Sequence, residues 1–355
     1  MRLSGYVKKQ SFLAMLLTTL ILLLLQALFS YIGEIEDFSD SYRWSDAALY
    51  VFWQLPELFI EILPVAALVG AVTGLGALSQ QSELTVMRAS GVSSVRIVGW
   101  ALQVAFFWAV AAVLVNQYWL PDASFKAQMI KDPKQAKSSM ELSGVWLYEN
   151  DRMSYISRAG AGGEILGYQS WQFDESGDLL EALSSERGHF DTSLKTWVLA
   201  EPKRTQFLSQ APLTAATSAQ SVQPIELSVR PDNLYLVTRT PEHLSLTDLL
   251  KYVQIADAKG ENAFEHRLSF WQKLLSPLSV LSLVLLASAF VFGESRSQSM
   301  GFRLVIALLT GLGFSYFQRL FSYLSLATQS APQLYVLLPI LFSAGLGWYL
   351  LRRRH

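Results

Sequence analysis

The stretch ILPVAALVGAVTGLGALSQQSELTVMRASG, residues 62–91, runs from an uncharged apolar segment into a short polar one. The apolar segment, Ile62–Gln81, has about the 20 residues that a helix needs to cross ~30 Å of hydrocarbon. The polar segment, Gln80–Gly91, has residues that can form a short helix. The stretch therefore predicts a membrane span followed by a short surface helix.

The composition of the whole chain agrees with this interpretation. Of its 355 residues, 51% are hydrophobic and only 16% are charged, which argues against an ordinary soluble domain. The formal net charge of −1 argues against a polyanion-binding surface. The absence of cysteine excludes disulfides, thiolate metal sites and thiol catalysis.

Uncharged segments also occur at residues 10–33 and 97–120, and between residues 304 and 351 the only charged residue is Arg319. We expect six membrane-spanning helices, at about 10–32, 57–79, 96–119, 270–292, 302–323 and 334–351. The first span is too long for a cleaved signal peptide and is followed by acidic residues. Because 35 of the 57 charged residues lie between Asp122 and Arg267, a polar domain is predicted between two sets of three spans. The predicted parts are residues 1–119, 120–262 and 263–355.

The orientation follows from the basic residues near the ends of the spans, which mark the cytoplasmic side of a membrane. These residues all fall on one side: Arg2, Lys8, Lys9, Arg88, Arg96, Arg296, Arg303 and Arg352–Arg354. Both termini are therefore expected in the cytoplasm, which agrees with an even number of spans. The large polar domain would lie outside, or in the periplasm of a cell with two membranes.

The polar domain has the pattern of short β-strands. Aromatic or β-branched runs at residues 145–148, 153–156, 168–173 and 197–199 are separated by turn-forming groups. This spacing predicts an all-β sandwich or jelly roll. Residues 209–223, rich in Ser, Thr, Ala and Gln, are expected to form a flexible loop. Ser245–Asp248 resembles a capping box, so an amphipathic connector helix should follow to about Lys259. Its apolar stripe would lie either on the membrane surface or against the β domain, and we favour the β domain.

Few residues in the chain suggest chemistry of its own. No phosphate-binding loop is present, and the four histidines have no metal-site spacing. Glu57 and Glu61 are one helical turn apart, and two interpretations remain open. They form either a carboxylate pair for glycan chemistry or proton transfer in a membrane-embedded enzyme, or a helix end that pairs with Arg319 or Lys273. We favour the second. A scaffold in which only the β domain matters is a further alternative.

Arg319 lies in an otherwise apolar run, where an arginine is costly unless it reaches the surface, finds a partner or faces a cavity. Its guanidinium matches the geometry of a phosphate, so contact with an anionic lipid headgroup is one of these possibilities. Phe317 and Phe321 are candidate lipid contacts beside it. Gly70 and Gly74 form a GxxxG motif that permits close helix approach, either within the chain or between subunits.

The segment at 80–91 allows two interpretations. Ser82 is suited to cap a helix, Glu83 lies at its positive end, Leu84 and Met87 form an apolar edge, and Gly91 is suited to end it. The segment is then either a plain turn at the membrane surface or a coupling helix that docks onto a cytoplasmic motor. The residue pattern does not decide between them.

The chain resembles a known family at residues 63–70 and 74–78 and in the SEL-x-VM-x-A-S-G block of residues 82–91. These residues are similar to those of the LptF/LptG permeases of lipopolysaccharide export, and the predicted order of three spans, β domain and three spans resembles theirs. Residues 244–246, 271–278 and 288–301 resemble the LptG branch more than LptF, which remains the alternative. The chain departs from the family pattern at Glu294-Ser295, where LptG proteins commonly have Pro-Leu. Residues 34–37 are acidic where some members place lysines.

The resemblance implies a non-catalytic subunit in the inner membrane of a bacterium. It implies a heterodimer with the paralogue LptF, two copies of the ATPase LptB, which would hold ATP and Mg, and the single-span protein LptC. No cofactor is expected on this chain. Lipopolysaccharide would enter from the outer leaflet of the inner membrane into a cavity between the two permeases, built partly by spans 1, 2 and 5. It would leave toward a periplasmic jelly-roll bridge. The coupling helix would match the residues Ser82, Glu83, Leu84, Met87 and Arg88, with Glu83 inserted into the ATPase.

Overall fold

The computed structural model describes residues 3–39, 42–131, 141–149, 151–160, 163–174, 177–208, 214–219, 222–225, 227, 231, 236, 239–259, 262–292 and 299–353. The chain forms two compact units. The helical unit comprises Met1–Lys131, Pro241–Gln254 and Asn262–His355, and the β unit comprises Asp132–Thr240 and Ile255–Glu261. Residues 294–295, where the sequence departs from the LptG pattern, lie outside the described residues.

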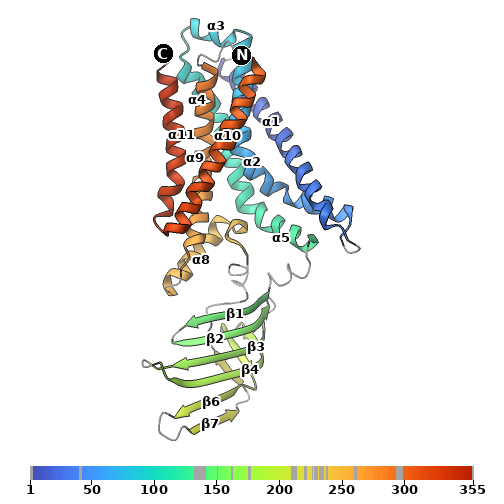
Figure 1. Cartoon of the computed structure of the whole chain (residues 1–355), viewed down its shortest axis with the longest axis vertical. Helices are drawn as coiled ribbons and strands as arrows, with labels where there is room; N and C mark the ends of the chain where they lie inside the picture. The colour runs from blue at the N-terminus through green and yellow to red at the C-terminus, as the bar shows by residue number, and fades with distance from the viewer. Residues whose placement is uncertain are drawn as a thin grey trace. The chain divides into compact units, whose positions relative to one another are not determined.

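Within the described residues, six helical stretches are long and apolar enough to cross a membrane, as predicted. Figure 1 shows them with their labels. The stretches are α1 (Leu3–Gly33), followed by a 3-10 turn (Glu34–Asp37); α2 (Trp44–Gln80); α4 (Ser94–Leu114), which continues through a π-helical turn (Val115–Trp119) into α5 (Leu120–Lys131); α9 (Phe264–Phe292); α10 (Met300–Thr328); and α11 (Pro332–Arg352). The short helix α3 (Glu83–Ala89) connects α2 to α4.

The helices extend beyond the predicted apolar spans, most of all α2, which begins 13 residues before the predicted residue 57. Its start is stabilised because the Asp46 carboxylate accepts a hydrogen bond from the backbone N–H of Arg43 at 2.8 Å. Hydropathy detects the part of a helix that lies in hydrocarbon. It does not detect a polar continuation held by local hydrogen bonds.

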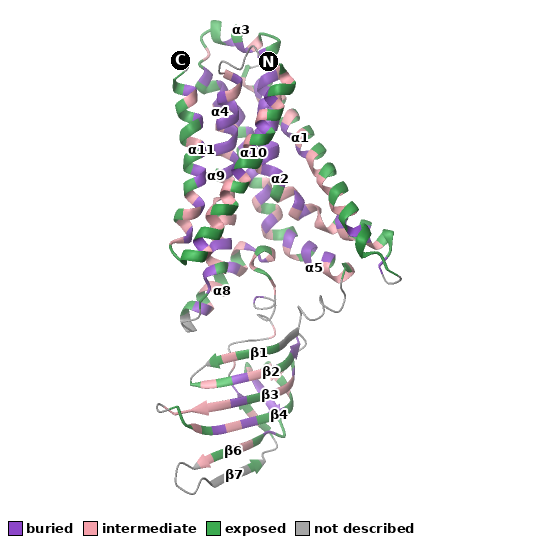
Figure 2. Cartoon of the chain, viewed as in Figure 1, coloured by how far each residue is buried: buried purple, intermediate pink, exposed green. Residues whose placement is uncertain are grey.

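Helix α2 is the most buried of the six, and α1 packs along it (Figure 2). The buried residues of α1, Val7, Ser11, Met15 and Thr19, recur every four positions and form one ridge. The glycines of α2 face this ridge: a Cβ at Gly70 would lie 2.6 Å from the Met15 Cα, and one at Gly74 3.0 Å from the Ala14 Cβ. The GxxxG motif therefore packs two helices of the same chain.

The three helices of the second half use similar close contacts. A Cβ at Gly311 of α10 would lie 2.9 Å from Val65 of α2, and one at Gly347 of α11 would lie 2.9 Å from the backbone of Leu286 in α9. The Ser343 hydroxyl donates to the Ser282 hydroxyl at 2.8 Å and joins α11 to α9. Both halves thus pack into one helical core.

In its described residues, the β unit is an antiparallel sheet of eight strands: β1 (Glu141–Glu149), β2 (Arg152–Gly160), β3 (Glu164–Phe173), β4 (Leu179–Asp191), β5 (Thr196–Ala200), β6 (Lys203–Leu208), β7 (Thr214–Ala219) and β8 (Val222–Ile225). The neighbours run β1-β2-β3-β4-β5-β8. β6 also pairs with β4, and β7 pairs with β6. The core includes Ile156, Tyr168, Leu183 and Trp197. The predicted all-β insertion is confirmed.

The flexible loop predicted at residues 209–223 is wrong for the described part of that range. Residues 214–219 form β7, which pairs with β6 in the register Thr205 to Thr217, and Val222 and Gln223 belong to β8. The sequence of β7, TAATSA, has little hydrophobic contrast, so the pattern of alternation that reveals half-buried strands is absent.

The connector helix is α8 (Leu246–Lys259), and its predicted cap is present. The Ser245 hydroxyl accepts from the Asp248 backbone N–H at 3.2 Å. The first turn is held by the helical unit, because Gln117 accepts from Leu246 N–H at 3.1 Å and donates to the Thr247 hydroxyl at 2.8 Å. The predicted packing of the connector on the β domain is therefore wrong for this turn.

Candidate functional site

The helical unit contains a cavity of about 670 Å³, of the size that small-molecule and lipid groups occupy. Residues of α1, α2, α9, α10 and α11 line it, together with Glu242 from a 3-10 turn (Pro241–His243). Much of the lining is aliphatic or aromatic, as at Leu25, Phe29 and Leu312. The cavity therefore combines apolar side chains with a set of polar ones, mostly from α9 and α10.

The charged side chains of the described lining are Glu61, Arg319 and Glu242, and the first two belong to a bridge that also includes Gln26 and joins three helices. Arg319 of α10 donates to Glu61 Oε1 of α2 at 2.6 Å, and Gln26 of α1 donates to Glu61 Oε2 at 3.1 Å. The predicted pairing of Glu61 with Arg319 is confirmed, and all three side chains line the cavity. Both oxygens of the carboxylate thus have a partner.

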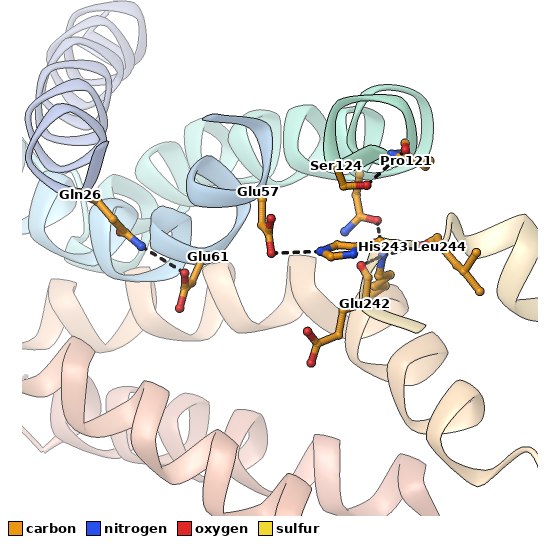
Figure 3. Close-up of polar contacts among 10 residues, drawn as sticks. Gln26, Glu57, Glu61, Pro121, Ser124, Glu242, His243 and Leu244 are labelled. Atoms are coloured by element: carbon orange, nitrogen blue, oxygen red, sulfur yellow. Dashed lines mark hydrogen bonds and ion pairs between the residues drawn. The ribbon is translucent and has the colours of Figure 1, made fainter. Parts of the chain in front are cut away.

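Glu57 has a different partner. Its carboxylate lies 3.4 Å from Nε2 of His243, and Figure 3 shows Glu57 pointing toward that histidine while Glu61 points toward Gln26. The two carboxylates therefore do not converge on one point, as general acid–base work on a shared substrate would require.

Lys273 does not pair with either glutamate, as one interpretation of the sequence expected. Its ammonium donates to Asn116 Oδ1 at 3.0 Å and to the carbonyl oxygens of Glu242 and Leu244 at 2.8 and 2.6 Å. These bonds use its three N–H donors and hold the chain that precedes α8 beside the cavity. The polar pair Asn116-Gln117, at the π-helical turn of an apolar span, was the signal in the sequence that could have revealed this junction.

Phe317 and Phe321 lie on the side of α10 that faces α11. Their ring centroids are 4.7 Å apart, and they lie 5.8 Å from Phe342 and 6.3 Å from Tyr335, respectively. Neither is among the residues that line the cavity, whereas Arg319 of the same helix is. The structure thus brings one of the three predicted substrate residues to the cavity.

The second candidate site is α3. Its predicted end is confirmed: Gly91 has φ of +91° and donates to the Arg88 carbonyl, and Val92 donates to the Met87 carbonyl. Its predicted cap is wrong. Ser82 has a left-handed φ of +60°, and its side chain makes no capping bond. A side chain reaches the N–H groups of the first turn from an extended residue, which Ser82 is not.

The predicted coupling residues lie on two different sides of α3. Leu84 and Met87 belong to the hydrophobic core of the helical unit, so they anchor the helix. The exposed side carries Val86, with 68% of its surface accessible, and the exposed Arg88. Glu83 Oε1 accepts a bond from the Tyr6 hydroxyl of α1 at 3.0 Å. Sequence reasoning missed Tyr6 and Val86, although Val86 lies opposite the apolar edge that it did identify.

The acidic turn that follows α1 forms a separate cluster. Glu34 is buried, accepts from Lys131 Nζ at 2.7 Å and accepts from the Tyr42 hydroxyl at 3.0 Å. Burial, and then the hydrogen bond to Glu34, raise the pKa of Tyr42 above its usual range. Glu34 is thus a buried structural group that joins α1 to α5.

In the described residues, six apolar helices, five of which line a cavity, with a β-sheet unit inserted between the third and the fourth, define a multi-pass membrane protein of the permease class. Residues 5–353 match the family described as lipopolysaccharide export system permease LptF/LptG, and the chain belongs to that family. It is a permease subunit of the lipopolysaccharide export transporter, and a separate subunit of that transporter hydrolyses ATP.

Two relatives indicate the branch of the family. The chain is 26% identical over 355 residues to the lipopolysaccharide export system permease protein LptG of Escherichia coli strain K12, and this alignment covers 99% of the chain and 98% of the relative. It is 24% identical over 358 residues, with the same shares covered, to the protein of that name from Haemophilus influenzae. The predicted similarity to LptG rather than LptF is thereby supported.

Proposed function

We propose that this permease binds the acyl chains of lipopolysaccharide in the cavity between α1, α2, α9, α10 and α11 and contacts its phosphorylated sugar through Arg319. The observation that carries this proposal is the cavity itself, which has an apolar wall and one cationic side chain in its lining. Each methylene moved from hydrocarbon to water costs ~0.8 kcal/mol, so acyl chains do not leave such a cavity for water unaided. Contraction of the cavity, driven by the ATPase, would supply the work.

The partners belong to the same proposal. In it, the chain pairs with LptF, binds one subunit of an LptB dimer through α3, and is joined by LptC. Basic residues lie near the start of α1 (Lys8 and Lys9), in α3 (Arg88) and near the start of α4 (Arg96). Their positions support a cytoplasmic location for the end of the helical unit that carries α3, and for both termini. The β unit would then lie in the periplasm.

The attachment of α3 supports its role as the coupling helix. Leu84 and Met87 fix it in the same core as α2, α4 and α9, so a displacement of α3 by the ATPase would be transmitted to these helices. Tyr6 links Glu83 to α1, a further wall of the cavity. The exposed Val86 and Arg88 remain available to a partner.

The test is Glu83→Ala in the full-length permease, purified with its partner subunits. We expect weaker co-purification of the ATPase, or ATP hydrolysis that continues while lipid release per ATP falls. The matched control is Glu265→Ala, which removes a carboxylate from the first turn of α9 and should change neither quantity. Unchanged assembly together with unchanged lipid release in Glu83→Ala would contradict the coupling role.

A further inference from the structure

Arg319 uses little of its hydrogen-bonding capacity. In the part of the chain that the structure describes, its one hydrogen-bond partner is Glu61 Oε1, whereas a guanidinium has five N–H donors. Its side chain is 60% exposed and lines the cavity. A two-pronged arginine–carboxylate pair would engage both oxygens, but Gln26 binds Oε2. Arg319 therefore has donors left for a second, anionic partner.

Glu61 has the properties of a replaceable partner. The carboxylate side chain is 48% exposed, and an ion pair exposed to this extent changes an equilibrium constant by no more than about fivefold. A phosphate offers more acceptor oxygens in the geometry that a guanidinium binds on two prongs. In competition for Arg319, a phosphate held in the cavity by its own acyl chains has the advantage.

We infer that Glu61 is the resident counter-ion of Arg319 and that the phosphate group of a bound lipid displaces it. This inference rests on the proposed function, in which the cavity receives a phosphorylated lipid. In the empty cavity Glu61 is the carboxylate that neutralises Arg319. When the lipid enters, the phosphate takes Arg319, and Glu61 keeps its bond to Gln26.

The exchange has a use in transport, because a transported lipid must also leave. When a fraction of Arg319 is engaged by Glu61, the apparent dissociation constant of the lipid rises in inverse proportion to the fraction that is free. Glu61 thus lowers the affinity for the phosphate and recaptures Arg319 after release. Its removal should strengthen binding, whereas the loss of a purely structural ion pair would weaken binding or leave it unchanged.

The test compares variants of the full-length permease, in its transporter complex in lipid nanodiscs, by their affinity for three probes. The probes are a bisphosphorylated acylated disaccharide, the same lipid without phosphates, and inorganic phosphate alone. We expect Glu61→Gln to bind the phosphorylated lipid about two- to fivefold more tightly than the wild type and the dephosphorylated lipid equally well. Arg319→Gln and the double variant should both lack this gain.

Glu57→Gln is the matched control. It removes the same charge one helical turn away, from a residue that pairs with His243 and does not line the cavity. It should give no gain. The inference is overturned if Glu61→Gln binds the phosphorylated lipid no more tightly than the wild type, if Glu57→Gln gives the same gain, or if the gain extends to the dephosphorylated lipid.

The remaining measurements show whether the bound phosphate belongs to a lipid or is free phosphate. They also distinguish failure of the counter-ion exchange from failure of the proposed function. If inorganic phosphate binds as tightly as the lipid and shows the same gain in Glu61→Gln, the ligand is free phosphate and the assignment to a lipid is overturned. If the wild type binds neither lipid, the proposed function fails. That result differs from an intact wild-type affinity with no effect of Glu61→Gln, which overturns only the counter-ion exchange.

Discussion

At the scale of single residues, α3 shows how two neighbouring side chains acquire opposite tasks. Leu84 is 4% exposed and belongs to the helical core, whereas Val86, two residues later, is 68% exposed. On a helix such residues point about 200° apart, so one anchors the helix while the other faces outward. An exposed valine on the helix proposed to bind the ATPase is a candidate for the centre of that interface.

We expect Val86→Asp to reduce co-purification of the ATPase about tenfold without changing the unfolding temperature of the permease, because a charge on a buried interface residue costs binding rather than folding. Leu84→Ala should instead destabilise the permease by roughly 2–4 kcal/mol through a cavity in its core. Pull-down yield and thermal unfolding separate the two effects. Normal ATPase capture by Val86→Asp would exclude this face of α3 as the docking surface.

The same helix shows what single residues reveal before a structure is known. The positions of Glu83 and Gly91 agreed with the rules for helix ends, since these rules depend only on neighbours along the chain. The bond from Tyr6 to Glu83 joins residues 77 positions apart, and no local rule predicts it. The contacts of Lys273 with Asn116 and two carbonyl groups were missed for the same reason.

At the scale of elements, the six spans were predictable because their length is set by the membrane. The contacts between the spans were not predictable. The sequence identified Gly70 and Gly74 as small residues on one face of a helix. It left open whether they face this chain or another subunit. The structure places α1 against them, with the Met15 backbone where a side chain at Gly70 would lie.

We therefore expect Gly70→Ala to destabilise the helical unit by about 1–3 kcal/mol, because the added methyl group forces α1 away from α2. Gly345→Ala in α11 is the control, since a Cβ at that position meets nothing within 4 Å. Both changes replace a glycine inside a helix by alanine, so their difference isolates the contact with α1. Equal unfolding temperatures for the two variants would show that the close approach of α1 and α2 is not required.

At the scale of the whole molecule, the chain consists of two units with separate cores. One core lies among the helices and the other lies in the sheet around Ile156, Tyr168 and Trp197. Charge segregation along the sequence indicated a separate polar domain, whereas residues 120–131 and 241–254, which were predicted to lie in it, belong to the helical unit. The strand order was not predictable, because β4 also pairs with β6 and β5 pairs with β8, and these pairings join strands that are not consecutive in sequence.

The separate cores lead to a prediction about which unit binds the lipid. Trp197 is 1% exposed, so Trp197→Ala should destabilise the sheet by roughly 3–5 kcal/mol and make residues 141–225 sensitive to proteolysis. All residues that line the cavity belong to the helical unit, so this variant should still bind the phosphorylated lipid with wild-type affinity, although onward transfer would fail. Trp146→Ala, at a position 53% exposed, is the matched control and should leave the sheet resistant. A loss of lipid affinity in Trp197→Ala alone would mean that the β unit takes part in binding and that the cavity among the helices is not sufficient.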